Sequence, residues 1–121
     1  MKKILIADDE EVLRMLIVDT LEDLDVDIIE AEDGQEAWEK VNENTFDLII
    51  LDYMMPRLTG YEVLLKVKSH EKLKQVPVLM LTAKSQQKDR QQLLEAGADY
   101  FMEKPFRPTQ LMSFVEELLH D

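Results

Sequence analysis

Three aspartates stand where apolar segments of the chain end. Asp52 follows the run 48–51 (L-I-I-L), and Asp8 and Asp9 follow the run 4–7 (I-L-I-A). An ionised carboxylate at the edge of an apolar segment is costly unless something offsets its charge. If the ends of the two segments meet, the three carboxylates repel one another and raise one another's pKa. The pattern therefore calls for a cation.

Magnesium and a lysine together can supply that positive charge. Lys104 follows the apolar run 99–102, and Thr82 and Ala83 follow 76–81. Three carboxylates contribute three negative charges, and Lys104 with one Mg²⁺ contributes three positive ones. Mg²⁺ prefers oxygen ligands, keeps several waters, and usually takes one or two carboxylates together with phosphate oxygens. The charge count favours a metal site.

The elements that position these residues alternate between strand and helix. Helical patterns lie between five short apolar runs, most of them continuous, as is typical of parallel strands covered on both faces. The sequence thus predicts an α/β fold: a doubly wound (βα)5 three-layer sandwich with a five-stranded parallel sheet. With the strand order 2-1-3-4-5, the acids after the first and third strands converge at one edge. The expected strands are 4–7, 26–31, 47–51, 76–81 and 99–102.

The expected helices carry their apolar residues on one face. In the first, Leu13, Leu16, Ile17, Leu21 and Leu24 share a face. The fourth, 85–97 (S-Q-Q-K-D-R-Q-Q-L-L-E-A-G), is mostly polar and ends at a glycine. The others are expected from Asp33-Gly34, over 61–69 and from Pro108.

Composition narrows the choice of function. The chain has 121 residues, expected to form one domain (1–121), no cysteine, and a net charge of −12. It shows no signal peptide or membrane-length apolar run, so we expect a cytoplasmic protein. The negative charge argues against nucleic acid or anionic membrane as a partner of this chain alone.

The motifs resemble those of the receiver domains of two-component response regulators, a flavodoxin-like family. The resemblance covers the whole chain, from K-I-L-I-A-D-D-E through L-D-Y-M-M-P-R-L-T-G and L-T-A to E-K-P-F. It implies that Asp52 accepts a phosphoryl group from a histidine kinase or phosphotransfer protein in the presence of Mg²⁺. Thr82 and the Ala83 backbone would contact that group, and Lys104, preceding a cis Pro105, would pair with it.

The resemblance also implies the metal ligands and a switch. Asp9 would bind Mg²⁺ directly, Asp8 mostly through water, and the Met54 carbonyl would join Asp52 as a further ligand. Phe101 stands where the family carries its switch aromatic, which turns inward when Thr82 engages phosphate.

The implied function is a phosphoacceptor switch that changes its helix 4–strand 5–helix 5 surface to control an unidentified output protein or domain. The chain would be no enzyme beyond catalysing its own phosphorylation and dephosphorylation. It would be a monomer or a phosphorylation-dependent dimer. The resemblance implies that Met54 and Lys84 lie beside the path of the hydrolytic water. Neither offers a carboxylate or amide to orient it, so we expect slow dephosphorylation.

Several alternatives stay open at this point. Alone, Asp52 is an ordinary turn acid, Lys104 a solvated lysine and Phe101 a core aromatic. A phosphatase of the haloacid dehalogenase class would need an acid where Met54 stands, and an FMN carrier would need a phosphate loop where A-D-D-E-E stands. A degenerate receiver that binds proteins without phosphorylation is the remaining alternative. The sequence leaves open whether the chain is a stand-alone receiver or part of a longer regulator.

Overall fold

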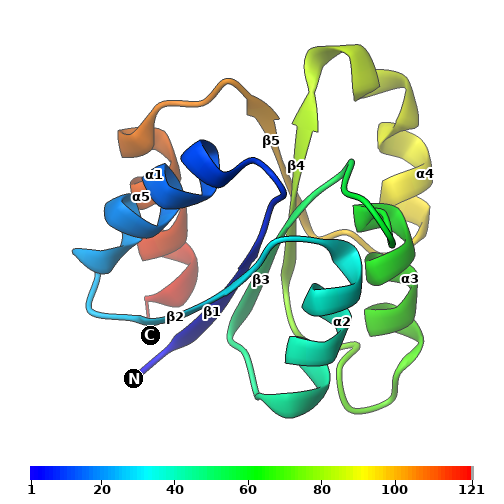
Figure 1. The fold of residues 1–121 in the computed structure, drawn as a ribbon, viewed down its shortest axis with the longest axis horizontal. Coiled ribbons are helices and arrows are strands. Elements are labelled where there is room, and N and C mark those ends of the chain that lie inside the picture. The colour runs from blue at the N-terminus through cyan, green and yellow to red at the C-terminus, as the bar shows by residue number, and fades with distance from the viewer. Residues whose placement is uncertain (121) are drawn as a thin grey trace.

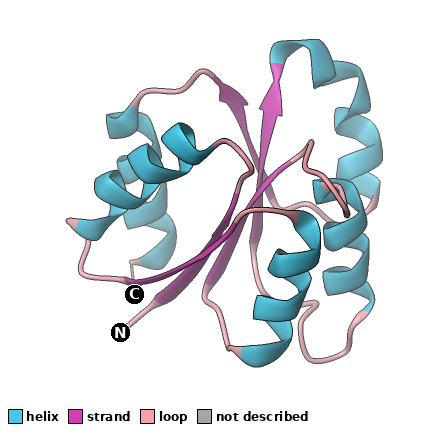
Figure 2. Cartoon of the chain, viewed as in Figure 1, coloured by secondary structure: helices cyan, strands magenta, loops and turns pink. Residues whose placement is uncertain are grey.

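The computed structural model describes residues 1–120, apart from the side chain of Lys84. Strands and helices alternate along this part of the chain (Figure 1 and Figure 2). The sheet is parallel with the order β2-β1-β3-β4-β5, as predicted, and β2 is an edge strand. The strands are β1 (Lys3–Ala7), β2 (Asp27–Ala31), β3 (Leu48–Asp52), β4 (Val78–Ala83) and β5 (Tyr100–Lys104).

Helices cover both faces of the sheet. They are α1 (Glu11–Glu22), α2 (Gly34–Glu43), α3 (Gly60–Ser69), α4 (Arg90–Glu95) and α5 (Pro108–Leu119), with a 3₁₀ segment η1 (Lys84–Asp89) before α4. Figure 1 shows α1 and α5 on one side and α2, α3 and α4 on the other. Among the described residues, no helix combines the length and apolar character that crossing a membrane requires.

Alternate residues of the central strands feed two separate cores. On β3, Leu48 and Ile50 pack in the core beneath α1 and α5, whereas Ile49 and Leu51 pack in the core beneath α2, α3 and α4. Successive strand side chains point to opposite faces, so a continuous apolar run serves both layers. This explains why the strand runs of the sequence do not alternate.

Gly60 brings the start of α3 against the end of β3. A Cβ atom at this position would collide with the carbonyl oxygen of Asp52, and the Gly60 amide donates to the Tyr53 carbonyl at 2.8 Å. Thr59 caps the helix, exchanging hydrogen bonds with Glu62 in a capping box. The loop after β3 therefore closes tightly over the backbone of Asp52.

Two sequence expectations need correction. The segment 85–97 does not form one helix, because its first half is the 3₁₀ segment η1 and α4 begins only at Arg90. Residues 84–89 (K-S-Q-Q-K-D) offer no apolar side chain to bury, and burial of an apolar face is what stabilises most protein helices. Leu16 was expected on the buried face of α1, but it is 42% exposed, while Ile17 and Leu21 are fully buried.

A polar hub joins three elements at the amino ends of the strands. Lys68 of α3 donates through Nζ to the carbonyl oxygens of Lys74 at 3.1 Å and Val76 at 2.8 Å, and to Asp99 Oδ2 at 2.9 Å. The same Asp99 oxygen accepts from the Val78 amide at 2.9 Å. One ammonium thus connects α3, the approach to β4 and the approach to β5.

Candidate functional site

An ammonium group lies among three carboxylates at the carboxyl ends of the strands. Lys104 Nζ, from the end of β5, is 2.9 Å from Asp52 Oδ1, at the end of β3. It is also 3.2 Å from Glu10 Oε1 and 3.8 Å from Asp8 Oδ2, both after β1. β1 and β3 are neighbours in the sheet, so their ends deliver acids to one place.

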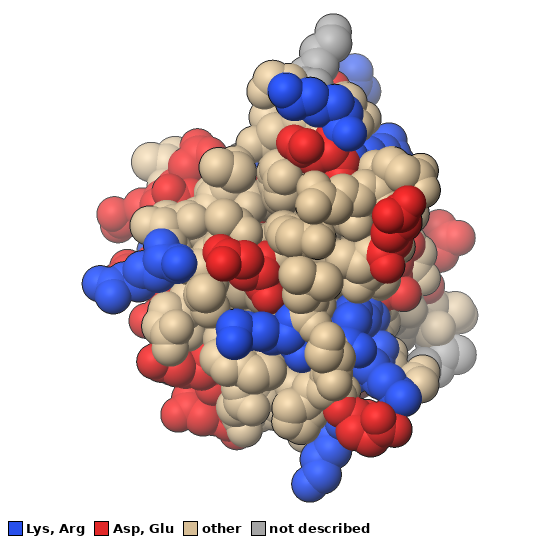
Figure 3. Space-filling view, turned by 90° about the vertical axis from the view of Figure 1, so that its right-hand side faces the viewer, with Lys and Arg blue, Asp and Glu red and all other residues tan. Residues whose placement is uncertain are grey.

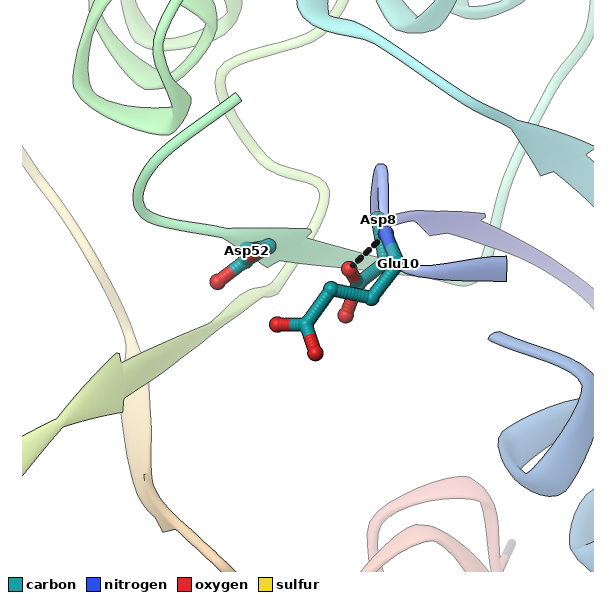
Figure 4. Close-up of side chains that lie close together, drawn as sticks. All are labelled: Asp8, Glu10 and Asp52. Atoms are coloured by element: carbon teal, nitrogen blue, oxygen red, sulfur yellow. Dashed lines mark hydrogen bonds between the residues drawn. The ribbon is translucent and has the colours of Figure 1, made fainter. Parts of the chain in front are cut away.

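The carboxylates of Asp8, Glu10 and Asp52 can hold a metal ion. One oxygen of each lies within 4.8 Å of the others (Figure 4). Asp8 Oδ1 accepts a hydrogen bond from the Glu10 amide at 2.9 Å, but Asp8 Oδ2 is buried without a hydrogen-bond partner. A buried, unpartnered carboxylate oxygen is costly to the folded protein, and a hard cation with bound waters would satisfy it. The residues fit magnesium.

Burial disfavours the ionised forms of the aspartates in the site. Burial, opposed by the hydrogen bond from Lys104 and reinforced by Asp8, raises the pKa of Asp52 to about 7. Burial also raises the pKa of Asp8. For Lys104, burial alone would lower the pKa, but the hydrogen bond to Asp52 and the carboxylates outweigh it, so its pKa is raised. A divalent cation would favour the ionised form of both aspartates.

Thr82 and Ala83 lie at the end of β4, between β3 and β5. Thr82 is buried and pairs in register with Glu103, while Ala83 pairs with Lys104. The Ala83 amide donates to Gln86 Oε1 at 2.7 Å. The Lys104–Pro105 peptide is cis, as the resemblance implied.

Asp9 and Met54 lie less centrally. Asp9 is exposed and outside the three-carboxylate cluster, but its charge contributes to raising the pKa of both Asp8 and Asp52. Met54 is 54% exposed. Their predicted roles as magnesium ligands stay predictions, as does the effect of Met54 on dephosphorylation. The Lys84 side chain lies outside the described part of the structure.

Phe101 is partly buried on β5 and packs against the core beneath α2, α3 and α4. The guanidinium carbon of Arg90 lies 4.6 Å from the centre of its ring, a cation–π contact. Its switching role stays a prediction.

Glu10 is the member of the cluster to which sequence reasoning gave no role. The run A-D-D-E-E offered four acidic candidates, and spacing alone does not show which of them turn toward β3. The geometry that selects Glu10 is local: its amide binds the Asp8 carboxylate, which folds the chain back after β1. Glu10 then reaches Lys104 through its own side chain.

Comparison with known proteins agrees with this arrangement. Residues 4–116 match the family model described as the response regulator receiver domain. This chain is a response regulator receiver domain. The receiver domain is 42% identical over 117 residues to the transcriptional regulatory protein SrrA of Staphylococcus aureus. That match covers 97% of the receiver domain and 47% of SrrA, so the chain spans about half the length of the curated relatives it matches.

Solved structures share the fold closely. The chemotaxis response regulator CheY4 of Vibrio cholerae superimposes with a TM-score of 0.91 at 34% identity, over 98% of the receiver domain and 99% of CheY4. The receiver domain of the sensor histidine kinase PA1611 of Pseudomonas aeruginosa gives 0.87 at 28% identity, over 97% and 96% of the two chains. That structure carries a magnesium ion coordinated in the active-site cleft.

Proposed function

We propose that this receiver domain accepts a phosphoryl group on Asp52 from a phosphohistidine of a histidine kinase or phosphotransfer protein, in the presence of Mg²⁺. The observation that carries the proposal is the buried Asp52 carboxylate held 2.9 Å from Lys104, beside a buried Asp8 oxygen that accepts no hydrogen bond. A merely structural aspartate would not need to be buried next to two further acids, one of them buried as well. Membership of the family, and the magnesium bound by the PA1611 receiver domain, support the same reading.

In the proposed reaction, an Asp52 carboxylate oxygen attacks the phosphorus atom of the donor. The phosphorus–nitrogen bond of the phosphohistidine breaks, and the imidazole leaves with the electron pair and takes a proton. Asp52 becomes an acyl phosphate. The Lys104 ammonium group, already paired with Asp52, then pairs with the phosphoryl oxygens. The Thr82 hydroxyl and the Ala83 backbone amide donate hydrogen bonds to the same oxygens.

Magnesium would be held by Asp52 and the acids after β1, with Asp9 turning in as a direct ligand, Asp8 acting through water, and the Met54 carbonyl contributing. When bound, the ion supplies charge neutralisation for the transferring group. We propose no activity on external substrates, because every group of the site serves to load or unload Asp52 itself.

The single test is intact mass measurement after incubation with acetyl phosphate and Mg²⁺. We expect one phosphate adduct on the wild type and none on Asp52→Asn or in EDTA. The Asp99→Asn variant, which alters an acid at the other end of the sheet, serves as control and should be phosphorylated normally. An adduct that persists in Asp52→Asn would assign the acceptor elsewhere, and its absence from the wild type would favour a degenerate receiver.

A protein that donates a phosphoryl group to Asp52 must bind a surface close to this residue. A hollow of about 480 Å³ between α1 and the loop after β5 begins at Glu10 and Lys104 and continues over Val12, Leu13, Leu16, Pro105 and Phe106. Val12 is 82% exposed and Leu16 42%. Because this apolar hollow is continuous with the site, we propose that the donor protein docks there.

Substituting the apolar hollow should separate protein donors from small ones. The donor is a purified phosphohistidine protein that phosphorylates the wild type. We expect Leu16→Lys to slow transfer from this donor at least about 10-fold, the usual effect of losing one well-placed contact. Phosphorylation by acetyl phosphate should be unchanged. Leu65→Lys, at a similarly exposed leucine of α3, is the matched control. Equal effects of the two substitutions, or equal slowing with acetyl phosphate, would place the docking surface elsewhere.

A further inference from the structure

The 3₁₀ segment η1 is tied to residues next to each predicted reactive group. Burial and the neighbouring Asp89 carboxylate raise the pKa of Tyr53, which is adjacent to Asp52 in sequence, so Asp89 of η1 lies close to the Tyr53 hydroxyl. The Gln87 amide donates to the carboxylate of Glu103, the residue before Lys104, at 2.8 Å. Through the contact already described, Gln86 holds the amide of Ala83, the residue after Thr82.

The contact of Gln86 differs from the other two in what it occupies. Gln86 Oε1 lies 2.7 Å from the Ala83 nitrogen, a short hydrogen bond. The Ala83 amide is one of the donors that the proposed function assigns to the phosphoryl group on Asp52. An N–H group makes one strong hydrogen bond at a time, so the side-chain oxygen of Gln86 and a phosphoryl oxygen compete for it.

We propose that the Gln86 side chain is a built-in competitor of the phosphoryl group, which must displace it from the Ala83 amide when Asp52 is loaded. This inference rests on the proposed function. Displacement removes the hydrogen bond that closes the start of η1, and among the side chains that the structure describes no other caps that end. The release of Gln86 thereby couples phosphorylation of Asp52 to the position of η1 and, because α4 follows η1 directly, to the position of α4.

Once Gln86 leaves, the segment keeps the polar contact of Gln87 with Glu103 but is held by few apolar contacts. Within α4, Leu93 is the fully buried residue, and Leu94 is 48% exposed. Arg90 rests on Phe101, a contact that depends on the position of that ring. An element with few buried contacts responds to the loss of one hydrogen bond more readily than a well-packed helix does.

The test is a titration with beryllofluoride, a phosphoryl mimic, in the presence of Mg²⁺. Gln86→Met keeps the side-chain length but removes the oxygen that accepts from the Ala83 amide. The affinity of this variant for beryllofluoride should therefore rise about 3- to 10-fold, the range for losing one competing hydrogen bond. Gln86→Glu keeps an acceptor and makes it a charged, stronger one. Its affinity should fall below that of the wild type. Gln87→Met is the matched control, since it loosens η1 through Glu103 without touching the Ala83 amide.

An amide chemical shift measured in the free protein distinguishes competition for the Ala83 amide from a general loosening of η1. The Ala83 amide proton should shift upfield in Gln86→Met, because its hydrogen bond is lost, and should hardly move in Gln87→Met. The inference is overturned if the control gains as much affinity as Gln86→Met, if Gln86→Met gains none, or if Gln86→Glu binds as tightly as the wild type. A wild type that binds no beryllofluoride would overturn the proposed function as well, whereas binding without the predicted order of variants overturns only this inference.

Discussion

At the scale of single residues, Asp52 has conflicting requirements. The proposed reaction requires its ionised form, yet burial beside Asp8 favours the protonated form and raises its pKa to about 7. The folded protein without metal therefore holds a proton on Asp52 at pH values where the unfolded chain, with an ordinary pKa of 3.8, has lost it. Placement for reaction thus costs stability near neutral pH.

Replacing the charge should make this cost measurable. The proton is bound more tightly in the folded state, so the contribution of Asp52 to stability is complete below about pH 4 and is lost as the pH rises through 7. In EDTA at pH 8, we expect Asp52→Asn to raise the free energy of unfolding by roughly 1–3 kcal/mol. At pH 5 the gain should shrink toward zero. Denaturant titrations of both proteins at the two pH values measure it.

Magnesium offers an internal control for that experiment. A saturating concentration at pH 8 should stabilise the wild type and much less the variant, because the cation favours the ionised aspartate. If Asp52→Asn is no more stable than the wild type at pH 8 in EDTA, the charge cluster is not a source of instability.

At the scale of elements, η1 and α4 form the least anchored part of the described chain. α1, α2, α3 and α5 each bury two or more residues fully, whereas α4 buries one and η1 is polar throughout. Local opening requires little free energy where few apolar contacts are lost. The site thus adjoins an element that can change position without unfolding the rest.

Hydrogen exchange should reveal that difference. In the free protein, amides of η1 and α4 should exchange at least about 10-fold faster than those of α5, because opening them costs less free energy. Addition of beryllofluoride with Mg²⁺ should change exchange and amide chemical shifts most between residues 83 and 106, as a population shift. Changes confined to the neighbourhoods of Asp8, Asp9 and Asp52 would contradict this, and α2 serves as the unchanged reference.

The sequence predicted the elements that pack and missed the one that does not. Short apolar runs, most of them continuous, placed all five strands within a few residues, and the strand order brought Asp8, Asp52 and Lys104 together. The 3₁₀ form of η1 was missed because the segment has no apolar periodicity, and the hydrogen bond from the Ala83 amide to Gln86 at its start leaves no trace in the sequence pattern. Glu10 was missed for a similar reason, since its direction is set by its own amide on Asp8. Short polar segments are decided by single hydrogen bonds that no periodicity records.

At the scale of the whole molecule, the two ends of the sheet have different tasks. The carboxyl ends carry Asp52, Thr82 and Lys104, and the amino ends carry the hub of Lys68 and Asp99. Figure 3 shows that, on the face seen there, basic and acidic side chains are interspersed, although the net charge is −12. Charge is therefore organised locally, in pairs and clusters.

Removing the hub ammonium should lower stability without impairing chemistry. In Lys68→Met, two carbonyl groups and Asp99 lose a donor that is only 15% exposed. We expect a loss of about 1–3 kcal/mol in the free energy of unfolding. Lys72→Met, an exposed lysine beyond the end of α3, should cost less than about 0.5 kcal/mol. Denaturant melts measure both, and phosphorylation of the folded variant by acetyl phosphate should match the wild type; equal stability of the two variants would argue against the hub.

The hub of Lys68 and Asp99 lies at the amino ends of the strands, away from the proposed phosphorylation site at their carboxyl ends, so the two ends of the sheet can evolve separately. Substitutions that retune the lifetime of the phosphoryl group or the choice of partner fall at strand ends and on η1, where they disturb few of the contacts that hold the fold. A lineage can therefore duplicate the domain and diverge in signalling speed or specificity while the Lys68–Asp99 end stays under purifying selection. Comparison of paralogues should find Asp8, Asp52, Thr82 and Lys104 kept, with fast-changing positions among the loop residues around them and on η1.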